Sequence, residues 1–183
     1  MRVAQVAISV AVLGSVLLGG PPAFAASISS TPAGGPVKLF ATPSNSLRAT
    51  ILMTGAIGDY GNALTIDKNG KADPNGNYVK VTLQKGGFEI NSTTLNAKVN
   101  QVQPSFNTAT CSAALSVAGP VTLFNGTGLY AGIDGTLTVA ETAAFILPRY
   151  ASGKNKGQCN TSNNTQPVKQ YASIMGTGTL SFS

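Results

Sequence analysis

Six acidic residues supply all the carboxylate side chains of this 183-residue chain, and Glu141 has the most unusual position among them. In the segment TLTVAETAAFIL, Glu141 has the same parity as Leu137 and Val139, and a strand directs alternate residues to one face. Burying an unpaired carboxylate is costly, so Glu141 requires a partner, a raised pKa or a bulge that exposes it. Arg149 and an internal water molecule are the candidate partners.

Asp59 and two tyrosines extend this candidate site. Asp59 shares the parity of Met53, and Tyr60 and Tyr130 occupy similar glycine-flanked turns. One interpretation is a lined ligand pocket, in which Glu141 and Asp59 are polar anchors and the tyrosines form the rim. The alternative is a bulge that turns Glu141 to solvent, with the tyrosines packed at strand ends, since bulges are common at barrel rims.

The histidine and cysteine content of the chain excludes several kinds of catalytic and metal site. Histidine is absent, which excludes Ser-His-Asp and Cys-His catalysis and the usual zinc sites with histidine ligands. Cys111 and Cys159 are the only cysteines, and an even count in an exported chain favours a disulfide over two free thiols. We therefore assign no catalytic residue, no metal ligand and no cofactor from the sequence.

Two loops have the composition of ligand-binding motifs without their essential features. The glycine-rich stretch GTGLYAGIDGTLTV precedes a Thr- and Val-rich segment, whereas a phosphate cradle requires a following helix. The segment DKNGKADPNGN places Asp67, Asn69 and Asp73 close together, as a calcium loop would. Lys71 and Ala72 stand where such a loop needs a ligand and a glycine, and no glutamate closes it. A solvated hairpin tip is the better interpretation.

The beginning of the chain predicts export. A positive charge at Arg2 is followed by an apolar run over 6–18, then by glycine and proline, then by small residues at Ala23 and Ala25. This is the layout of a secretory signal peptide cleaved after Ala25. An uncleaved anchor is the weaker alternative, because the run is shorter than the ~20 residues that span a bilayer. We expect a signal peptide over 1–25, a flexible leader over 26–46 and one domain over 47–183, secreted or held at the cell envelope.

Composition favours a folded domain without a nucleic-acid partner. Charged residues form 10% of the chain and hydrophobic residues 43%, which is too apolar for a disordered coat. The formal net charge is +6, but the basic residues are scattered, and only Lys154 and Lys156 approach a cluster. A nucleic-acid groove would need a concentrated basic stripe with interleaved aromatic residues. No later segment reaches the length of a transmembrane helix.

Alternation with period two predicts an all-β fold. In YVKVTLQ, apolar Val79, Val81 and Leu83 alternate with polar residues, and the same pattern predicts a further strand over 93–99. Turn sequences such as GDYGN, KGG and NGTG separate the apolar runs, and no stretch has a sustained helical period. Short strands at this spacing indicate a β-barrel or a sandwich.

Several motifs resemble one family of small barrels. GTGLYAGIDGT resembles the Gly-Thr-Gly-x-Tyr-x-Gly-x-x-Gly-Thr hairpin of allene oxide cyclase and dirigent-like proteins. TGAIGDYG, GNYVKVTLQKGGFEIN and GTGTLSF are similar to secreted bacterial proteins with that domain. The resemblance implies an antiparallel barrel of about eight strands, whose lumen holds a small apolar molecule. Plant relatives cyclise an oxylipin or guide phenoxy-radical coupling, but none of their catalytic residues matches a position here.

Three functions follow from these observations. The first is a secreted barrel that binds a small apolar molecule without catalysis, with Glu141, Asp59, Tyr60, Tyr130 and Arg149 as candidate lumen or rim residues. The second is a cyclase-like or dirigent-like enzyme whose lumen orients a reactive substrate. The third is a filled barrel with a structural or host-facing surface role. Barrels of about eight strands can be either filled or hollow, so the volume of the lumen discriminates among these functions.

Overall fold

The computed structural model describes residues 32–162 and 164–183, which contain nine strands and one short helix. The signal peptide expected over 1–25 lies outside the described residues. The elements in chain order are β1 (Gly35–Pro43), β2 (Arg48–Gly55), β3 (Asp59–Ile66), β4 (Tyr78–Leu83), β5 (Gly86–Asn91), α1 (Thr93–Val99), β6 (Ser105–Asn107), β7 (Ser112–Gly128), β8 (Ile133–Ile146) and β9 (Lys169–Phe182).

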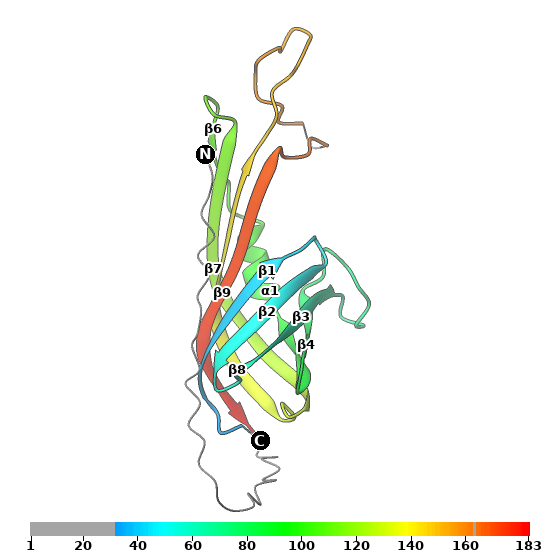
Figure 1. Ribbon diagram of the computed structural model, residues 1–183, viewed down its shortest axis with the longest axis vertical. Helices are drawn as coiled ribbons and strands as arrows, with labels where there is room; N and C mark the ends of the chain where they lie inside the picture. Colours follow the sequence, from blue (N-terminus) through cyan, green and yellow to red (C-terminus); the bar gives the residue numbers. More distant parts are fainter. Residues whose placement is uncertain (1–31, 163) are drawn as a thin grey trace, which may run out of the picture.

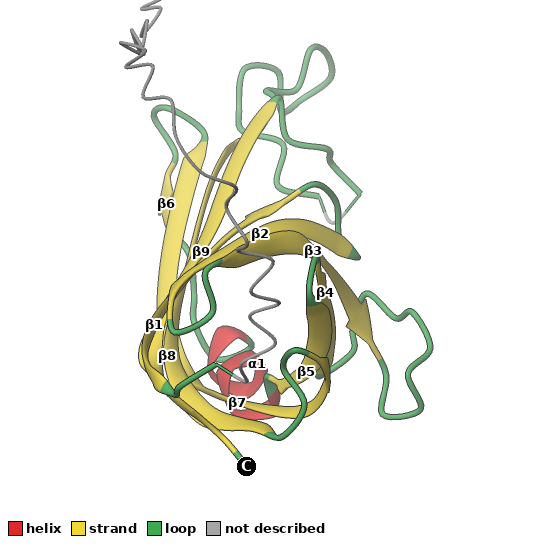
Figure 2. Cartoon of the chain, turned by 60° about the horizontal axis from the view of Figure 1, so that its bottom comes forward, coloured by secondary structure: helices red, strands yellow, loops and turns green. Residues whose placement is uncertain are grey.

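The strands form a closed antiparallel barrel, which confirms the predicted fold class. Neighbouring strands follow the order β5-β4-β3-β2-β1-β9-β8-β7-β6, and an additional pairing of β5 with β7 closes the ring. Eight strands therefore build the barrel, while β6 pairs only with β7 and lies outside the ring. Figure 2 shows this ring, with α1 within its outline. Closure leaves the eight barrel strands without unpaired edges along the ring.

The side chains that alternate inward along the strands fill one half of the barrel. Inward residues from all parts of the ring are buried in a single core, and the largest of them lie towards the end where β7 turns into β8. We call this the closed end. Its packing includes Met53, Phe88, Tyr130, Ile133 and Leu180, each with at most 4% of its surface exposed.

The N-terminal boundary of the domain differs from the prediction. Strand β1 begins at Gly35 and is hydrogen-bonded on both sides, to β2 and to β9. Val37 and Leu39 are buried in the core, so the flexible leader expected over 26–46 is wrong for the residues of this strand. Pro36 and Pro43 at the strand ends, together with the preceding glycines, gave the segment the composition of a linker.

The strand predicted over 93–99 is a helix instead. Because β5 pairs directly with β7, the chain between them must cross the end of the barrel, where a strand would have no partner. Leu95 and Val99 are spaced four residues apart, so they lie on one face of a helix as readily as on one face of a strand. Leu95 is buried against the inner side of β7, and Lys98 Nζ donates to the carbonyl of Ala118 at 3.3 Å.

Three strands continue beyond the barrel and form an arm. The arm comprises β6 and the paired segments 112–116, 142–146 and 169–173 of β7, β8 and β9, with the loop residues 147–162 and 164–168 at its tip. Figure 1 shows it projecting from the end of the barrel opposite the closed end. The predicted disulfide between Cys111 and Cys159 is present and ties the tip loop to the start of β7. No helix among the described residues is long and apolar enough to span a membrane.

Candidate functional site

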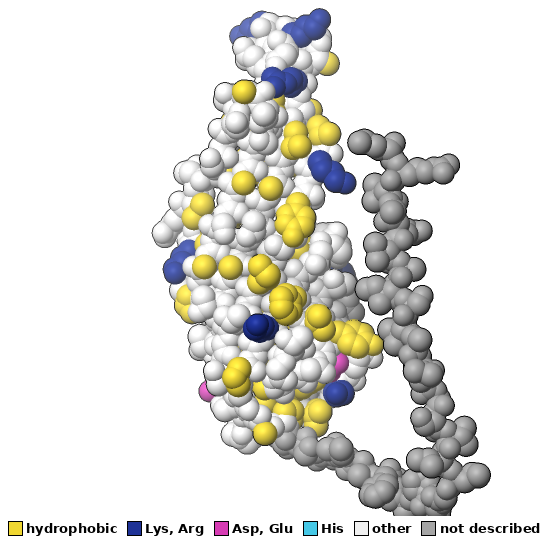
Figure 3. Space-filling model, turned by 60° about the vertical axis from the view of Figure 1, so that its left-hand side comes forward, with side chains coloured by type: hydrophobic (Ala, Val, Ile, Leu, Met, Phe, Trp, Pro, Cys, Tyr) yellow, Lys and Arg dark blue, Asp and Glu magenta, His cyan; other side chains and the backbone are white. Residues whose placement is uncertain are grey.

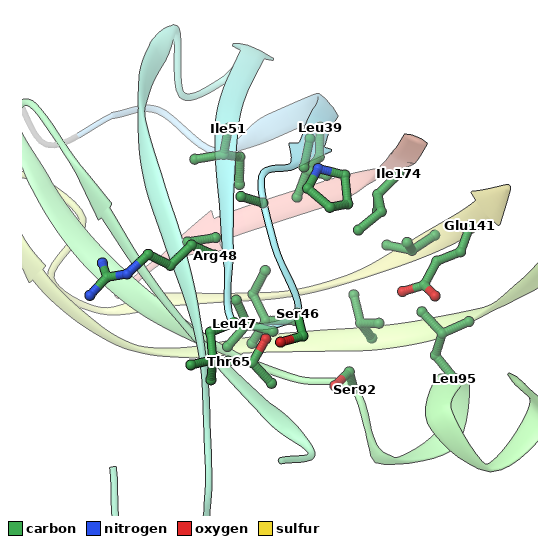
Figure 4. A pocket seen from close by; sticks show the side chains of 18 of the residues that line it. Leu39, Ser46, Leu47, Arg48, Ile51, Thr65, Ser92, Leu95, Glu141 and Ile174 are labelled. Carbon is green, nitrogen blue, oxygen red and sulfur yellow. The ribbon is translucent and has the colours of Figure 1, made fainter. Parts of the chain in front are cut away.

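A cavity of about 210 Å³ occupies the half of the lumen nearer the arm. Its walls are inward-facing aliphatic side chains from most strands of the barrel, among them Leu39, Ile51, Ala63, Val79 and Val139. Figure 4 shows Leu39 and Ile51 at the cavity, with Ser46 of the turn between β1 and β2 nearby. Asn45, Ser46 and Arg48 of that region also line the cavity and are exposed, so the cavity reaches solvent beside this turn.

Small residues explain why this half of the lumen is hollow. Ala41, Ala49 and Ala63 face the cavity, whereas corresponding inward positions nearer the closed end carry Met53 and Phe88. An alanine reaches only a short distance from the strand, and the centre of an eight-stranded barrel then stays unfilled. The sequence therefore produces a barrel that is packed at one end and open at the other.

Glu141 lines the cavity and lies in a regular strand. It pairs with Val117 on β7 and with Ile174 on β9, and the registers of both ladders run through it without a shift. The bulge that would have turned Glu141 to solvent is therefore absent. Figure 4 shows the Glu141 side chain directed into the cavity, beside Leu95 of α1.

The carboxylate of Glu141 has no hydrogen-bond or ion-pair partner among the described residues, and its surroundings are apolar. Burial in these surroundings raises the pKa of Glu141 above its ordinary value, because the charged form loses its hydration. A carboxylate in this position can accept a hydrogen bond from a ligand or, when protonated, donate one. It is the single acidic group that lines the cavity among the described residues.

Neither of the two arginines among the described residues neutralises Glu141. Arg149, the partner considered from the sequence, lies in the arm, where Nη1 donates to Gly157 O and Nη2 to Ala109 O, each at 2.6 Å. That predicted pairing is wrong, and Arg149 does not line the cavity. Arg48 does line it, but its side chain is exposed, and Figure 4 shows the guanidinium directed away from Glu141.

Asp59 and Tyr130 meet at the closed end, not at the cavity. Asp59 is 5% exposed and Tyr130 is fully buried, and Tyr130 Oη donates to Asp59 Oδ2 at 2.6 Å. The backbone N–H groups of Tyr60 and Lys85 also donate to the Asp59 carboxylate, at 2.8 and 3.0 Å. Asp59 is buried, in agreement with its parity, but it does not lie beside Glu141 as the pocket interpretation required, because neither Asp59 nor Tyr130 lines the cavity.

The protonation of this pair is set by its hydrogen bonds. Desolvation alone would raise the pKa of Asp59, but the bonds from Tyr130 and from the backbone outweigh it, and the pKa is lowered. Desolvation and the neighbouring carboxylate raise the pKa of Tyr130. The tyrosine therefore stays a neutral donor and the aspartate an ionised acceptor. Tyr130 also packs edge-on against Phe88, with ring centroids 6.2 Å apart.

Tyr60 points to the outside of the barrel, so its predicted place at a pocket rim is wrong. It is 61% exposed and pairs across strands with Leu52, which in turn pairs with Phe40, and Phe40 with Met175. These four residues form a row of exposed apolar side chains on the outer face. Figure 3 shows hydrophobic side chains spread along one outer face of the molecule.

The cavity edge contains residues that the sequence analysis did not select. Ser46 and Arg48 come from the turn between β1 and β2, while buried Ser92 and Leu95 come from the segment that crosses the barrel end. The sequence SNS before Arg48 indicates a turn, but no local signal shows that this turn borders the lumen. The calcium-like segment is the turn between β3 and β4, where Asp67 Oδ1 accepts the N–H groups of Asn69 and Lys71.

Comparison with known proteins adds no assignment to this geometry. No family model, no curated protein and no solved structure matches the chain. The resemblance to allene oxide cyclase and dirigent-like proteins therefore stays a prediction, and the function is argued from the cavity.

Proposed function

We propose that this protein is exported and binds a small, mostly apolar molecule in the cavity of its barrel. The observation that carries the proposal is the hollow half of the lumen, about 210 Å³, with aliphatic walls and an edge exposed to solvent. Pockets for drug-sized ligands measure ~300–1,000 Å³, so the ligand of this cavity is smaller than a drug-sized molecule. The walls of an apolar cavity gain dispersion contacts when an apolar ligand fills it.

Export is supported by two independent features. The first is the layout of residues 1–25, which is typical of a secretory signal peptide. The second is the disulfide between Cys111 and Cys159, a bond that persists in oxidising compartments outside the cytosol.

Binding without catalysis is the simplest use of this site. Acid–base catalysis commonly requires two groups with separated pKa values near the reacting atoms. Among the described residues, the cavity is lined by one carboxylate, that of Glu141, and by the exposed Arg48 at its edge. The cyclase-like alternative would need the lumen to act by orienting its substrate alone. The hollow half of the lumen favours ligand binding over a filled barrel with a surface role.

The test is to fill the cavity with a larger side chain. Ala63→Leu adds three carbon atoms at an inward position that lines the cavity, and Ala118→Leu makes the same change at an exposed position of β7. Binding of small cyclohexyl and phenyl compounds is measured by ligand-observed NMR. We expect binding to the wild type and to Ala118→Leu, and at least a tenfold loss in Ala63→Leu with the fold retained. Equal binding to all three proteins, or to none, would contradict the proposal.

A further inference from the structure

Glu141 places a carboxylate in the cavity wall, at a position where an apolar side chain would make the folded protein more stable. Glu141 follows Val139 on the inward face of β8, and its partners across the ladders are Val117 and Ile174. An aliphatic residue at 141 would continue this wall without the cost of desolvating a carboxylate. The position is therefore poorly explained by stability, and a ligand that uses the carboxylate explains it better.

We propose that the ligand of this cavity is a small hydrophobic amine, whose ammonium group pairs with the Glu141 carboxylate while its apolar part fills the space between the aliphatic walls. This inference rests on the proposed function and names the ligand class of the same site. It is carried by the position of the carboxylate in the wall and by the absence of a counter-ion to it among the described residues.

The groups that surround Glu141 leave its charge available to a ligand. Val117 of β7, Ile174 of β9 and, on the next strand, Ala41 of β1 are apolar. Helix α1 carries Lys98, but its Nζ donates to the carbonyl of Ala118, and Lys98 does not line the cavity. The only other charged side chain in the described lining is that of Arg48, which is exposed at the cavity edge.

An ammonium group fits this environment better than the alternatives. A carboxylate or phosphate ligand would meet a like charge in apolar surroundings, where repulsion is weakly screened. A neutral ligand can at most donate a neutral hydrogen bond to the ionised carboxylate, and it would remove more of the hydration of that charge without compensating it. A primary ammonium group instead forms a charge-assisted hydrogen bond, about twice as strong as a neutral one. Folding has already removed part of the hydration of Glu141, so binding adds mainly the desolvation of the amine.

Three molecules of one shape separate these cases. Cyclohexylmethylamine, cyclohexylmethanol and cyclohexanecarboxylate share a ring that fits a small apolar cavity and differ in charge. At pH 7.5 the amine is protonated, because alkyl amines have a pKa of about 10. Calorimetric titration of the wild-type protein should give at least tenfold tighter binding of the amine than of the alcohol, and no measurable binding of the carboxylate.

Two variants assign this preference to Glu141. Glu141→Gln keeps the shape of the side chain and removes its charge, so we expect the preference for the amine to disappear while the alcohol still binds. Asp134→Asn removes an exposed carboxylate from the same strand and should behave as the wild type. Acidification that protonates Glu141 should weaken binding of the amine, because a neutral carboxyl group forms no ion pair. Thermal melting of each variant verifies that it is folded.

The outcomes distinguish the ligand class from the binding function. If the alcohol binds as tightly as the amine, or if Glu141→Gln binds the amine as well as the wild type does, the proposed amine is overturned and the binding cavity stands. If none of the three molecules binds and Ala63→Leu leaves every small apolar probe unaffected, both the ligand class and the proposed function are wrong.

Discussion

Tyr130 Oη donates a hydrogen bond of 2.6 Å to Asp59 Oδ2, and this bond joins residues 71 positions apart at the closed end of the barrel. Tyr130 lies in the turn between β7 and β8, and Asp59 begins β3. The same carboxylate accepts the backbone N–H of Lys85, in the turn between β4 and β5. One buried side chain thus holds three hairpin regions together. The glycine-rich stretch GTGLYAG is the turn that delivers Tyr130 to this contact, which gives it a structural role.

Removing the hydroxyl of Tyr130 should destabilise the fold. A hydrogen bond to a charged group contributes about 1.5–3 kcal/mol, and Tyr130→Phe also leaves a buried carboxylate with one donor fewer. We expect a loss of that size in the free energy of unfolding, measured by urea denaturation. Tyr60→Phe is the matched control, because Tyr60 is largely exposed, and it should change stability by less than ~0.5 kcal/mol. Equal effects of the two variants would contradict the role given to Tyr130.

Asp59 should make the protein sensitive to acid. Its pKa in the folded state is lowered, so its stabilising contribution is present above the ordinary value of 3.8 and is lost as the pH falls through the folded pKa. Asp59→Asn should therefore reduce stability at neutral pH and flatten the decline of stability below pH ~4. Urea denaturation between pH 2 and 7 measures both effects. A variant whose decline has the wild-type slope would show that other groups cause it.

Glu141 should have the opposite pH dependence. Its folded pKa is raised above the ordinary value of 4.5, so the folded state is favoured when Glu141 is protonated. In the ligand-free protein this contribution is complete below pH ~4.5 and is lost as the pH rises through the folded pKa. Glu141→Gln should thus be more stable than the wild type at neutral pH and nearly equal to it at low pH. A constant difference across this range would contradict the burial of the charge.

The sequence indicates which face of a strand a residue occupies, but not its position along the barrel axis. Period-two alternation gave Asp59 and Glu141 the parity of inward residues but left open a bulge that would turn Glu141 to solvent; in the structure Asp59 is buried and Glu141 lines the cavity. Parity does not state how far along the barrel axis a residue lies, because that depends on the tilt and stagger of the strands. Asp59 therefore lies at the closed end and Glu141 at the cavity, so the interpretation that joined them in a single pocket is wrong.

The local composition of two elements also fails to indicate their structure. Strand β1 follows a glycine- and proline-containing stretch and has proline near both ends, which resembles a linker until its pairing with β2 and β9 is known. Helix α1 has only seven residues, and Leu95 and Val99 satisfy both periods. In each case a partner distant in sequence decides the structure. Arg149 was misplaced for the same reason, since the length of β8 and β9 carries it out of the barrel and into the arm.

The disulfide should stabilise the arm locally and the domain globally. Cys111 and Cys159 are 48 residues apart, and closing a loop of this length in the unfolded chain is worth up to ~4 kcal/mol. Cys111→Ser, Cys159→Ser and the double variant should all lose similar stability, because each removes the same bond. Hydrogen exchange should increase most in the residues 147–162 around Cys159. Unchanged melting after reduction of the wild type would contradict this prediction.

A glycine at position 126 is required by the turn that positions Tyr130. A Cβ atom at Gly126 would overlap the carbonyl oxygen of Tyr130 and approach Ile133 Cγ2 to 2.8 Å, so Gly126→Ala must displace the turn. Overpacking of this kind typically costs ~1–3 kcal/mol, and here it also disturbs the bond to Asp59. Gly70→Ala is the control, because a Cβ atom there has open space and only the positive φ of +79° opposes it. Urea denaturation should show the larger loss for Gly126→Ala, and its effect should shrink when Tyr130 is already phenylalanine, since the two changes act on one contact.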